Sequence, residues 1–435
     1  MRMTEKRSEL LGETYFFAEH ESGLPIYVFP KELTTTYAIL SARYGSVDRA
    51  FRKKGEREWI TPPAGVAHFL EHKLFENADG SDSFEVFSAL GADANAYTAC
   101  NRTAYLFSCT EQFDEALSEL LRFVFSPYFT EQTVKKEQGI IAQEIRMYDD
   151  NPWERCFQNL MEGMYHTHPV RESICGSEAS IARITDQILY ECHSAFYQPE
   201  NMALVVCGRV TAEQVLRIAD EALPKKWEKT EIERYHCAEP RGVRASFTEA
   251  RMQVSKPIFS IGIKDTNIPS NPAERMRRDA AMSLLEEILF SRAGDFYSTL
   301  FEEGLITASY SYGYSIAADF AFHTVSGESD CPKEILRRLR EYLKRVQKEG
   351  IAEDAFERCR RVLYADEIRG YDSTEEIANN LLTFVFDEAD LFAYPEVLMS
   401  IRREELPALL GELLEKDAIC LSAVYPLNTQ KGEER

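Results

Sequence analysis

The stretch from Gly65 to Asn77, GVAHFLEHKLFEN, places two histidines and a glutamate within five residues: His68, Glu71 and His72. At about 100° per residue, a helix sets Glu71 and His72 within roughly 60° of His68, on one face. Two imidazoles from one helical turn can bind one metal ion, and a carboxylate beside them can accept a proton from water. The stretch therefore predicts a zinc-binding helix that also carries a general base.

The other sides of this helix are apolar, which predicts that it is buried. Those sides carry Val66, Phe69, Leu70 and Leu74. Burying two imidazoles and a carboxylate is costly unless they pair with one another or hold a metal. A structural hydrogen-bonded cluster of histidine and glutamate is the alternative that the motif alone leaves open.

A second helix is predicted in VKKEQGIIAQEIRMYDDNPWER, which begins at Val134. Glu137 and Glu144 are seven residues apart and so lie within about 20° of each other, on the side that carries Ile140 and Ile141. One carboxylate could complete a metal site with three protein ligands, and the other could orient a ligand histidine. The spacing does not say which does which, and a surface helix with marginal isoleucines is the alternative.

The order HxxEH, followed by paired glutamates about 65 and 72 residues later, resembles the pitrilysin/insulinase family of inverzincin zinc metallopeptidases, which includes the mitochondrial processing peptidase and short bacterial members. The similarity covers most of residues 20–215 and is weaker afterwards. It includes the stretches YGSVDR, GADANAYTACNRTAY, DNPWER, HPVRESICG and YQPENMALVVCG.

The resemblance implies a role for each matching residue. His68, His72 and Glu144 would bind one zinc ion per chain, Glu71 would be the catalytic base, and Glu137 would support a ligand from outside the coordination sphere. It also implies that the strand containing Asn95 and Ala96 pairs with an extended peptide substrate. Without the resemblance, ADANAYT is typical of an ordinary edge strand.

The two halves of the chain share a pattern of strand, helix and hairpin, which predicts a duplicated α+β fold. We expect two similar domains, each a largely antiparallel sheet covered by helices, that enclose a clam-like cavity. The catalytic domain would span residues 1–222, a charged linker 223–247, and a second domain 248–435. The second half offers no equivalent of HFLEH, so it should bind no metal.

The second half also departs from the family pattern in LFEEGLITASYSYGY. Leu300 stands where active members usually have an arginine that binds substrate, and Thr307 where they have a tyrosine. Tyr310, Tyr312 and Tyr314 follow and could donate to an oxyanion, as could Arg292. Because the three tyrosines alternate, packing on one face of a strand is the alternative.

Composition limits the class of protein. The net charge of −22 argues against nucleic-acid binding and permits, without requiring, a preference for basic peptides. The ten cysteines form no CxxC pair, the N-terminus lacks an apolar signal core, and no run approaches a membrane helix. These features predict a cytoplasmic protein with reduced thiols and no membrane partner.

We therefore expect a zinc endopeptidase that cleaves peptides or short unstructured segments. The competing interpretation is a noncatalytic or partner-dependent subunit of a homodimer, or of a heterodimer with a zinc-less homologous subunit. A zinc hydrolase that cleaves a nonpeptide amide would share the same chemistry. The presence of His68, Glu71, His72 and Glu144 together favours an enzyme.

Overall fold

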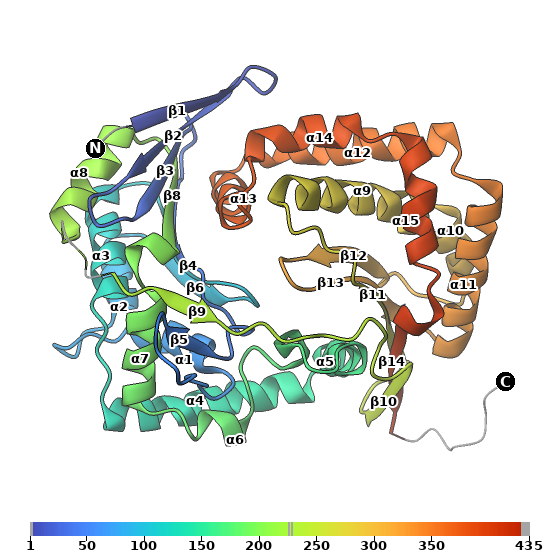
Figure 1. The fold of residues 1–435 in the computed structure, drawn as a ribbon, viewed down its shortest axis with the longest axis horizontal. Coiled ribbons are helices and arrows are strands. Elements are labelled where there is room, and N and C mark those ends of the chain that lie inside the picture. Colours follow the sequence, from blue (N-terminus) through green and yellow to red (C-terminus); the bar gives the residue numbers. More distant parts are fainter. Residues whose placement is uncertain (1–2, 225–226, 228, 428–435) are drawn as a thin grey trace. The chain divides into compact units, whose positions relative to one another are not determined.

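The structure is a computed structural model that describes residues 3–224, 227 and 229–427, and these fall into two compact units (Figure 1). The first unit combines the segment ending at Ile145 with Ser173–His236 and Ile368–Phe392. The second combines Arg146–Glu172, Cys237–Glu367 and the segment beginning at Ala393. Each unit therefore contains sequence from both halves of the chain.

The first unit is built on a seven-stranded sheet. From edge to edge its strands are β1 (Met3–Ser8), β2 (Glu13–Glu19), β3 (Pro25–Pro30), β8 (Met202–Gly208), β4 (Thr36–Ala42), β7 (Thr103–Cys109) and β6 (Asp93–Thr98). All neighbours are antiparallel except β3 and β8, which are parallel. Strand β6, which contains Asn95 and Ala96, is an edge strand, as its sequence predicts.

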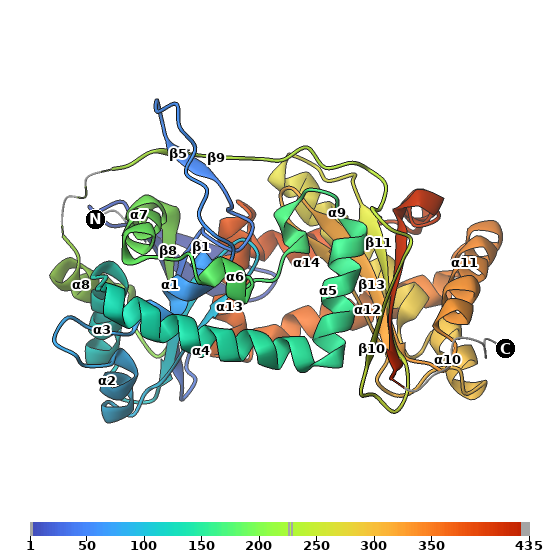
Figure 2. The ribbon, with the colours of Figure 1, turned by 90° about the horizontal axis from the view of Figure 1, so that it is seen from below.

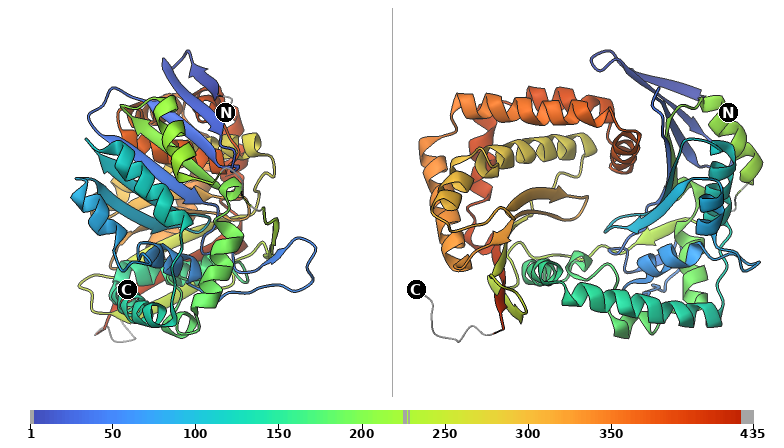
Figure 3. Two further views of the ribbon diagram at one scale, coloured as in Figure 1. Left: turned by 90° about the vertical axis from the view of Figure 1, so that its left-hand side faces the viewer. Right: turned by 180° about the vertical axis from the view of Figure 1, so that it is seen from behind.

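Helices cover both faces of this sheet (Figure 3). Along β4, Ala38 and Leu40 face one core cluster, while Tyr37 and Ile39 face the other. This two-sided burial explains why the central strands are apolar at successive positions. The helices of this unit are α1 (Val66–Leu74), α2 (Ser83–Ala89), α3 (Phe113–Phe125), most of α4 (Glu131–Asp150), α6 (Glu178–Ile181), α7 (Asp186–Phe196), α8 (Ala212–Ala222) and α13 (Thr374–Phe386).

The second unit is built on a five-stranded sheet. Its strands, from edge to edge, are β10 (Phe247–Met252), β14 (Ile419–Pro426), β11 (Ile258–Asp265), β13 (Ala321–Glu328) and β12 (Ser311–Ile316). Its helices are α5 (Pro152–Met164), α9 (Pro272–Phe290), α10 (Asp295–Glu302), α11 (Pro332–Glu349), most of α12 (Glu353–Gly370), α14 (Tyr394–Ser400) and α15 (Leu406–Glu412).

The two sheets share one topology, which confirms the predicted duplication. In each, a parallel pair is followed by three antiparallel neighbours, and β3-β8-β4-β7-β6 corresponds to β10-β14-β11-β13-β12 in both spatial and chain order. The first sheet adds the β1–β2 hairpin at its edge. The α+β class with two similar sheet-and-helix units is therefore correct.

The units do not follow the expected boundaries at residues 222 and 248, because each half of the chain supplies a helix to the other unit. Helix α5, from the first half, packs on β10, β11 and β14 of the second sheet (Figure 2). Helix α13, from the second half, packs on β4 and β8 of the first sheet. We call this arrangement the helix exchange.

The switch between units at His236 and Cys237 falls inside the predicted linker 223–247. The linker is not structureless in its described part, since β9 (Ile232–Arg234) pairs with β5 (Phe51–Lys53) of the first unit. Farther on, the Glu239 carboxylate accepts hydrogen bonds from three backbone N–H groups and from buried Lys264 of the second unit. Short 3-10 turns lie at Pro169–Arg171, Pro199–Asn201, Leu391–Ala393, Arg403–Glu405 and Lys416–Ala418.

Candidate metal centre

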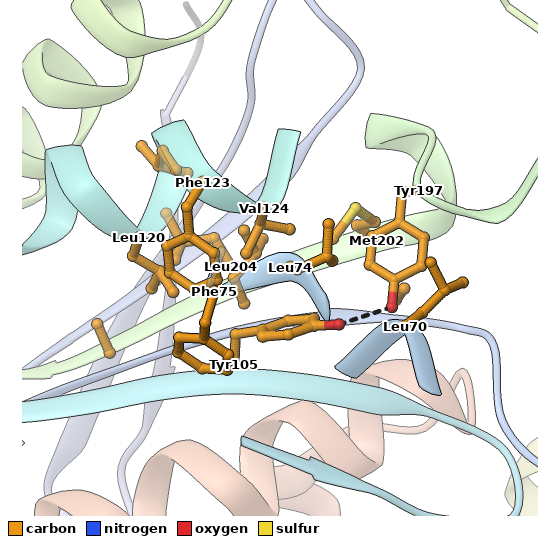
Figure 4. Packing of buried hydrophobic residues seen from close by; sticks show 14 of the residues in the cluster. Leu70, Leu74, Phe75, Tyr105, Leu120, Phe123, Val124, Tyr197, Met202 and Leu204 are labelled. Atoms are coloured by element: carbon orange, nitrogen blue, oxygen red, sulfur yellow. Dashed lines mark hydrogen bonds between the residues drawn. The ribbon is translucent and has the colours of Figure 1, made fainter. Parts of the chain in front are cut away.

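Helix α1 holds its two histidines against the core of the first unit. Gly65 begins the helix with φ 89°, and a Cβ there would lie 2.4 Å from the Cys175 carbonyl oxygen, so glycine is required. Leu70 and Leu74 pack in the cluster whose Tyr105 and Tyr197 hydroxyls are 2.9 Å apart (Figure 4). The predicted burial of this helix is confirmed, and its polar side carries His68, Glu71 and His72.

Helix α4 brings both predicted glutamates to that polar side. Its Ile141 is fully buried in the core, which fixes the helix, whereas Ile140 is 45% exposed and does not share the buried face. One Glu144 oxygen lies 3.6 Å from His68 Nε2, and the other lies 3.4 Å from His72 Nε2. Glu137 Oε1 lies 3.0 Å from His72 Nδ1.

The donor atoms of His68, His72 and Glu144 all lie within 4.8 Å of one another. Zinc ligands at tetrahedral angles and about 2.0–2.1 Å from the ion stand about 3.3–3.4 Å apart, and the distances of 3.6 and 3.4 Å from the Glu144 oxygens to the two histidine nitrogens are close to this value. If His72 donates its Nδ1 hydrogen to Glu137, the Nε2 lone pair faces Glu144 and the metal position. Two imidazoles and one carboxylate are a donor set typical of catalytic zinc.

The electrostatics of the metal-free cluster differ between the two histidines. Burial lowers the pKa of His68 to about 4, and the neighbouring His72 acts in the same direction. Burial also opposes protonation of His72, but hydrogen bonds to Glu137 and Glu144 outweigh it and raise its pKa to about 10. In metal-free protein at neutral pH, these shifts favour the extra proton and its positive charge on His72 and leave His68 neutral.

Glu71 lies beside the cluster and is held by a residue that the sequence interpretation missed. Thr98, at the end of β6, donates its hydroxyl hydrogen to Glu71 Oε2 at 2.6 Å. Burial raises the pKa of Glu71 against the effect of this hydrogen bond. The alternation of strand residues could have identified Thr98, because it shares a face with Ala96, which packs toward the α1 side of the sheet.

Cys175 is a second residue that the sequence interpretation missed. Its sulfur lies 3.9 Å from His68 Nε2, and the residue is buried. His68 Nδ1 is also buried and has no hydrogen-bond partner among the described residues. The His68 ring is therefore held by packing and by contacts at its Nε2 side, unlike His72, whose Nδ1 is fixed by Glu137.

The residues predicted to bind substrate are divided between the two units. Asn95 and Ala96 lie on β6, and the Asn95 side chain accepts a hydrogen bond from the Ala96 N–H at 2.9 Å. In the second unit, Tyr310 is only 4% exposed and belongs to the core, so the packing alternative describes it. Tyr312 is partly buried on β12 and donates its hydroxyl hydrogen to Glu287 at 2.6 Å.

The second-half positions that depart from the family pattern have local roles. Leu300 is a buried core residue. The Thr307 hydroxyl bonds Glu328, and Arg292 donates to the Ala308 carbonyl oxygen at 2.9 Å. Tyr314 donates to Asp265 at 2.7 Å. Each of these side chains therefore already has a partner or a packing role within the second unit.

Sequence comparison matches both halves of the chain to known families. Residues 60–178 match the family described as insulinase, peptidase family M16, and residues 183–363 match the peptidase M16 inactive domain. A Bacillus subtilis protein named uncharacterized zinc protease YmfH is 38% identical over 96% of this chain and 98% of its own length. The chain belongs to peptidase family M16. The match to the inactive domain covers residues 183–363 and so contains none of His68, His72 and Glu144. The word inactive therefore refers to the part of this M16 chain that follows the metal cluster.

Solved structures agree with this assignment. A structure described as an M16-like peptidase from Alicyclobacillus acidocaldarius superposes with a TM-score of 0.90 at 34% identity, covering 98% of this chain and 99% of its own. A protease from Helicobacter pylori shares the fold, with a TM-score of 0.83 at 18% identity over 95% of this chain and 100% of its own. Among the described residues, no helix of this M16 chain is long and apolar enough to cross a membrane.

Proposed function

We propose that this M16 chain is a zinc-dependent endopeptidase that cleaves peptides or short unstructured segments. The observation that carries the proposal is the convergence of His68, His72 and Glu144 within 4.8 Å, with Glu71 on the same helix. A structural His–Glu pair would need only two partners, whereas donor atoms of three residues come together here. The names of the relatives as zinc proteases support the same proposal.

His68, His72 and Glu144 would hold one zinc ion per chain, which would supply Lewis acidity toward a peptide carbonyl group. Glu137 accepts the Nδ1 hydrogen of His72 and so keeps its Nε2 lone pair directed at the site. Glu71 takes a proton from the attacking water and delivers it to the leaving amine. Its raised pKa suits it to this exchange, and Thr98 fixes the position of the carboxylate.

Strand β6 is the proposed peptide-binding edge. It is the last strand of the first sheet, so one row of its backbone N–H and C=O groups has no neighbouring strand among those described. A peptide in extended conformation could pair there with little dependence on its sequence. Because the Asn95 side chain already accepts from the Ala96 N–H, binding at this position would require that side chain to turn away.

A partner-dependent subunit is the second candidate. It is favoured by Leu300 and Thr307, which stand where active relatives are expected to have arginine and tyrosine and which have local roles here. In this candidate the chain would hold zinc but would need a second subunit, identical or homologous, to cleave peptides. Purified protein should then bind zinc stoichiometrically without peptidase activity.

The test compares wild type with Glu71→Gln and with Glu85→Gln, an exposed glutamate on α2 that serves as control. Zinc content would be measured by metal analysis, and peptides that co-purify would be identified by mass spectrometry. We expect one zinc ion in all three proteins and about 10²–10⁴-fold slower peptide cleavage in Glu71→Gln alone. Peptides trapped only by Glu71→Gln would identify the substrate.

Two results would contradict the endopeptidase proposal. Undiminished zinc-dependent cleavage by Glu71→Gln would remove its assigned base. Stoichiometric zinc with no cleavage and no trapped peptide would favour the partner-dependent candidate, and adding nonpeptide amides to the screen would detect the related hydrolase.

A further inference from the structure

The proposed peptide-binding strand is held from both faces of the first sheet, at two successive residues. Successive strand residues point to opposite faces, so Thr98 reaches the α1 side while Tyr97 reaches the α13 side. Thr98 bonds Glu71 at 2.6 Å, and the Tyr97 hydroxyl donates to Asn379 Oδ1 at 3.3 Å. The residue that fixes the base and the residue that contacts α13 are therefore neighbours in the chain.

Helix α13 contacts the β6–β7 hairpin at two points one helical turn apart. Besides accepting from Tyr97, Asn379 donates through Nδ2 to the Tyr37 hydroxyl at 3.1 Å. The second point is Thr383, whose hydroxyl accepts from Arg102 Nη1 at 2.9 Å. Tyr97 is the last residue but one of β6 and Arg102 lies in the turn, so the two contacts fix both the strand and the turn.

Helix α13 is itself firmly seated, which makes it an effective anchor. Leu381 and Leu382 are buried against the first sheet. At the C-terminal end of the helix, the Arg43 guanidinium donates to the carbonyl oxygens of Val385 and Phe386 at 2.9 and 2.5 Å. The backbone of α13 is therefore held in place, and the hydrogen bond from Tyr97 to Asn379 ties β6 to it.

We propose that Asn379 is a positioning residue for peptide binding: it holds β6 in the extended geometry that a substrate strand needs. The inference rests on the proposed function for its consequence, and on the contacts of α13 for its structural part. Asn379 touches neither the metal cluster nor Glu71 in any contact that the structure shows, so its loss should weaken peptide binding without removing zinc. The site in the first half thus depends on a helix encoded by the second half.

The structural part is tested by hydrogen exchange of residues 93–103 in the zinc-loaded full chain. The first variant is Asn379→Leu, which removes the side-chain hydrogen bonds with Tyr97, Tyr37 and the Glu375 carbonyl oxygen. The second is Tyr97→Phe, which removes only the contact with β6. Asn380→Leu makes the same change at the exposed neighbouring residue and is the matched control. We expect exchange about threefold to tenfold faster in the first two variants, the range for one lost hydrogen bond, and unchanged in the control.

The functional part is tested with a pool of quenched-fluorescent ten-residue peptides. In Asn379→Leu and Tyr97→Phe we expect KM to rise about threefold to tenfold with kcat and zinc content unchanged, since one hydrogen bond is lost outside the reacting groups. The same labelled peptides should bind more weakly by the same factor when either substitution is combined with Glu71→Gln. A merely structural role would lower the melting temperature and leave KM unchanged.

The outcomes separate the two proposals. If hydrogen exchange of residues 93–103 is unchanged in both variants, Asn379 does not hold β6. If exchange is faster but KM is unchanged, Asn379 holds β6 but does not position it for peptide binding. If Asn379→Leu fails to fold, Tyr97→Phe decides both questions. If wild type cleaves no peptide and binds none, the proposed function fails, and the positioning role fails with it even where exchange shows the anchor to be real.

Discussion

The two units have the same five-strand topology, but they treat histidine and glutamate differently. In the first, α1 and α4 bring donor atoms of three residues within 4.8 Å of one another. In the second, His323 on β13 and Glu286 on α9 bond each other at 2.7 Å, and both are buried. Aligned on their hairpins, His323 occupies the strand position of Tyr105, a core residue in the first unit.

The difference shows what distinguishes the candidate metal centre from the second unit. Each unit places a histidine close to a glutamate, so the presence of these two residue types does not by itself make a metal site. In the second unit they bond each other through His323 Nδ1, while His323 Nε2 is buried without a hydrogen-bond partner among the described residues. Burial raises the pKa of Glu286 against that hydrogen bond. In the first unit Glu137 contacts Nδ1 of His72, so Nε2, the nitrogen that faces Glu144, is left for a metal ion.

The largest effect should come from removing a ligand in the first unit. His72→Ala and Glu144→Ala should lose zinc and reduce peptide cleavage to background, because two donors no longer enclose the ion. His323→Gln, which keeps a hydrogen-bond donor for Glu286, should retain one zinc ion per chain. Metal analysis of the three purified proteins is the measurement. Zinc loss in folded His323→Gln would end the contrast between the units.

The helix exchange predicts that core truncations act on the sheet that a helix covers. Leu381→Ala on α13 and Leu160→Ala on α5 should each cost about 2–5 kcal/mol in the free energy of unfolding, because each deletes a fully buried side chain. Hydrogen exchange should accelerate in β4 and β8 for the first variant and in β11 and β14 for the second. The reverse pattern would show that the helices stabilise their own halves of the sequence.

Glu137→Gln should weaken zinc binding about 10–100-fold, the usual effect of losing a carboxylate that orients a ligand histidine. Glutamine can still accept a hydrogen bond from His72 but carries no charge. Titration against a chromophoric chelator measures the affinity, and Glu131→Gln, exposed at the start of α4, is the control. Equal affinities in the two variants would mean that Glu137 serves only the fold.

The smallest effect, when expressed per pH unit, is the change of zinc affinity with pH. In metal-free protein His72 keeps its proton up to a pKa of about 10, whereas zinc binds the neutral imidazole, so binding at neutral pH releases a proton. Zinc affinity should therefore rise with pH, by about tenfold per unit for one proton, and level off as the pH approaches that pKa. In Glu137→Gln the levelling should occur at lower pH. A flat profile in wild type would show that His72 is neutral before zinc binds.

Much of the candidate site could be predicted from the sequence because its spacing is helical. Residues three and four apart share a face of α1, and residues seven apart share a face of α4, so His68, His72 and Glu144 needed only the two helices to meet. The same periodicity misplaced Ile140, which is exposed while Ile141 is buried. Strand alternation places Thr98 on the same face of β6 as Ala96, but it does not show the hydrogen bond to Glu71. Cys175 lies far along the chain from α1, and no local pattern shows that it approaches His68.

The fold was predictable in its elements and its repeat, but not in the helix exchange. The apolar runs of β4 and β8 require cover on both faces, which indicates a second layer of helices. Amphipathic spacing shows that α5 and α13 have a buried side, yet it cannot say which sheet that side covers. Gly262 gives one hint only in retrospect: a Cβ there would lie 2.4 Å from the Met164 sulfur on α5.

The helix exchange has a consequence for how the chain can be divided. A cut between His236 and Cys237 gives fragments that each carry a helix the other needs, and each would leave an apolar sheet face exposed to water when alone. Separately expressed fragments should aggregate, whereas co-expressed fragments should restore each other in the manner of a swapped dimer. Each half of the chain thus needs the other in order to fold.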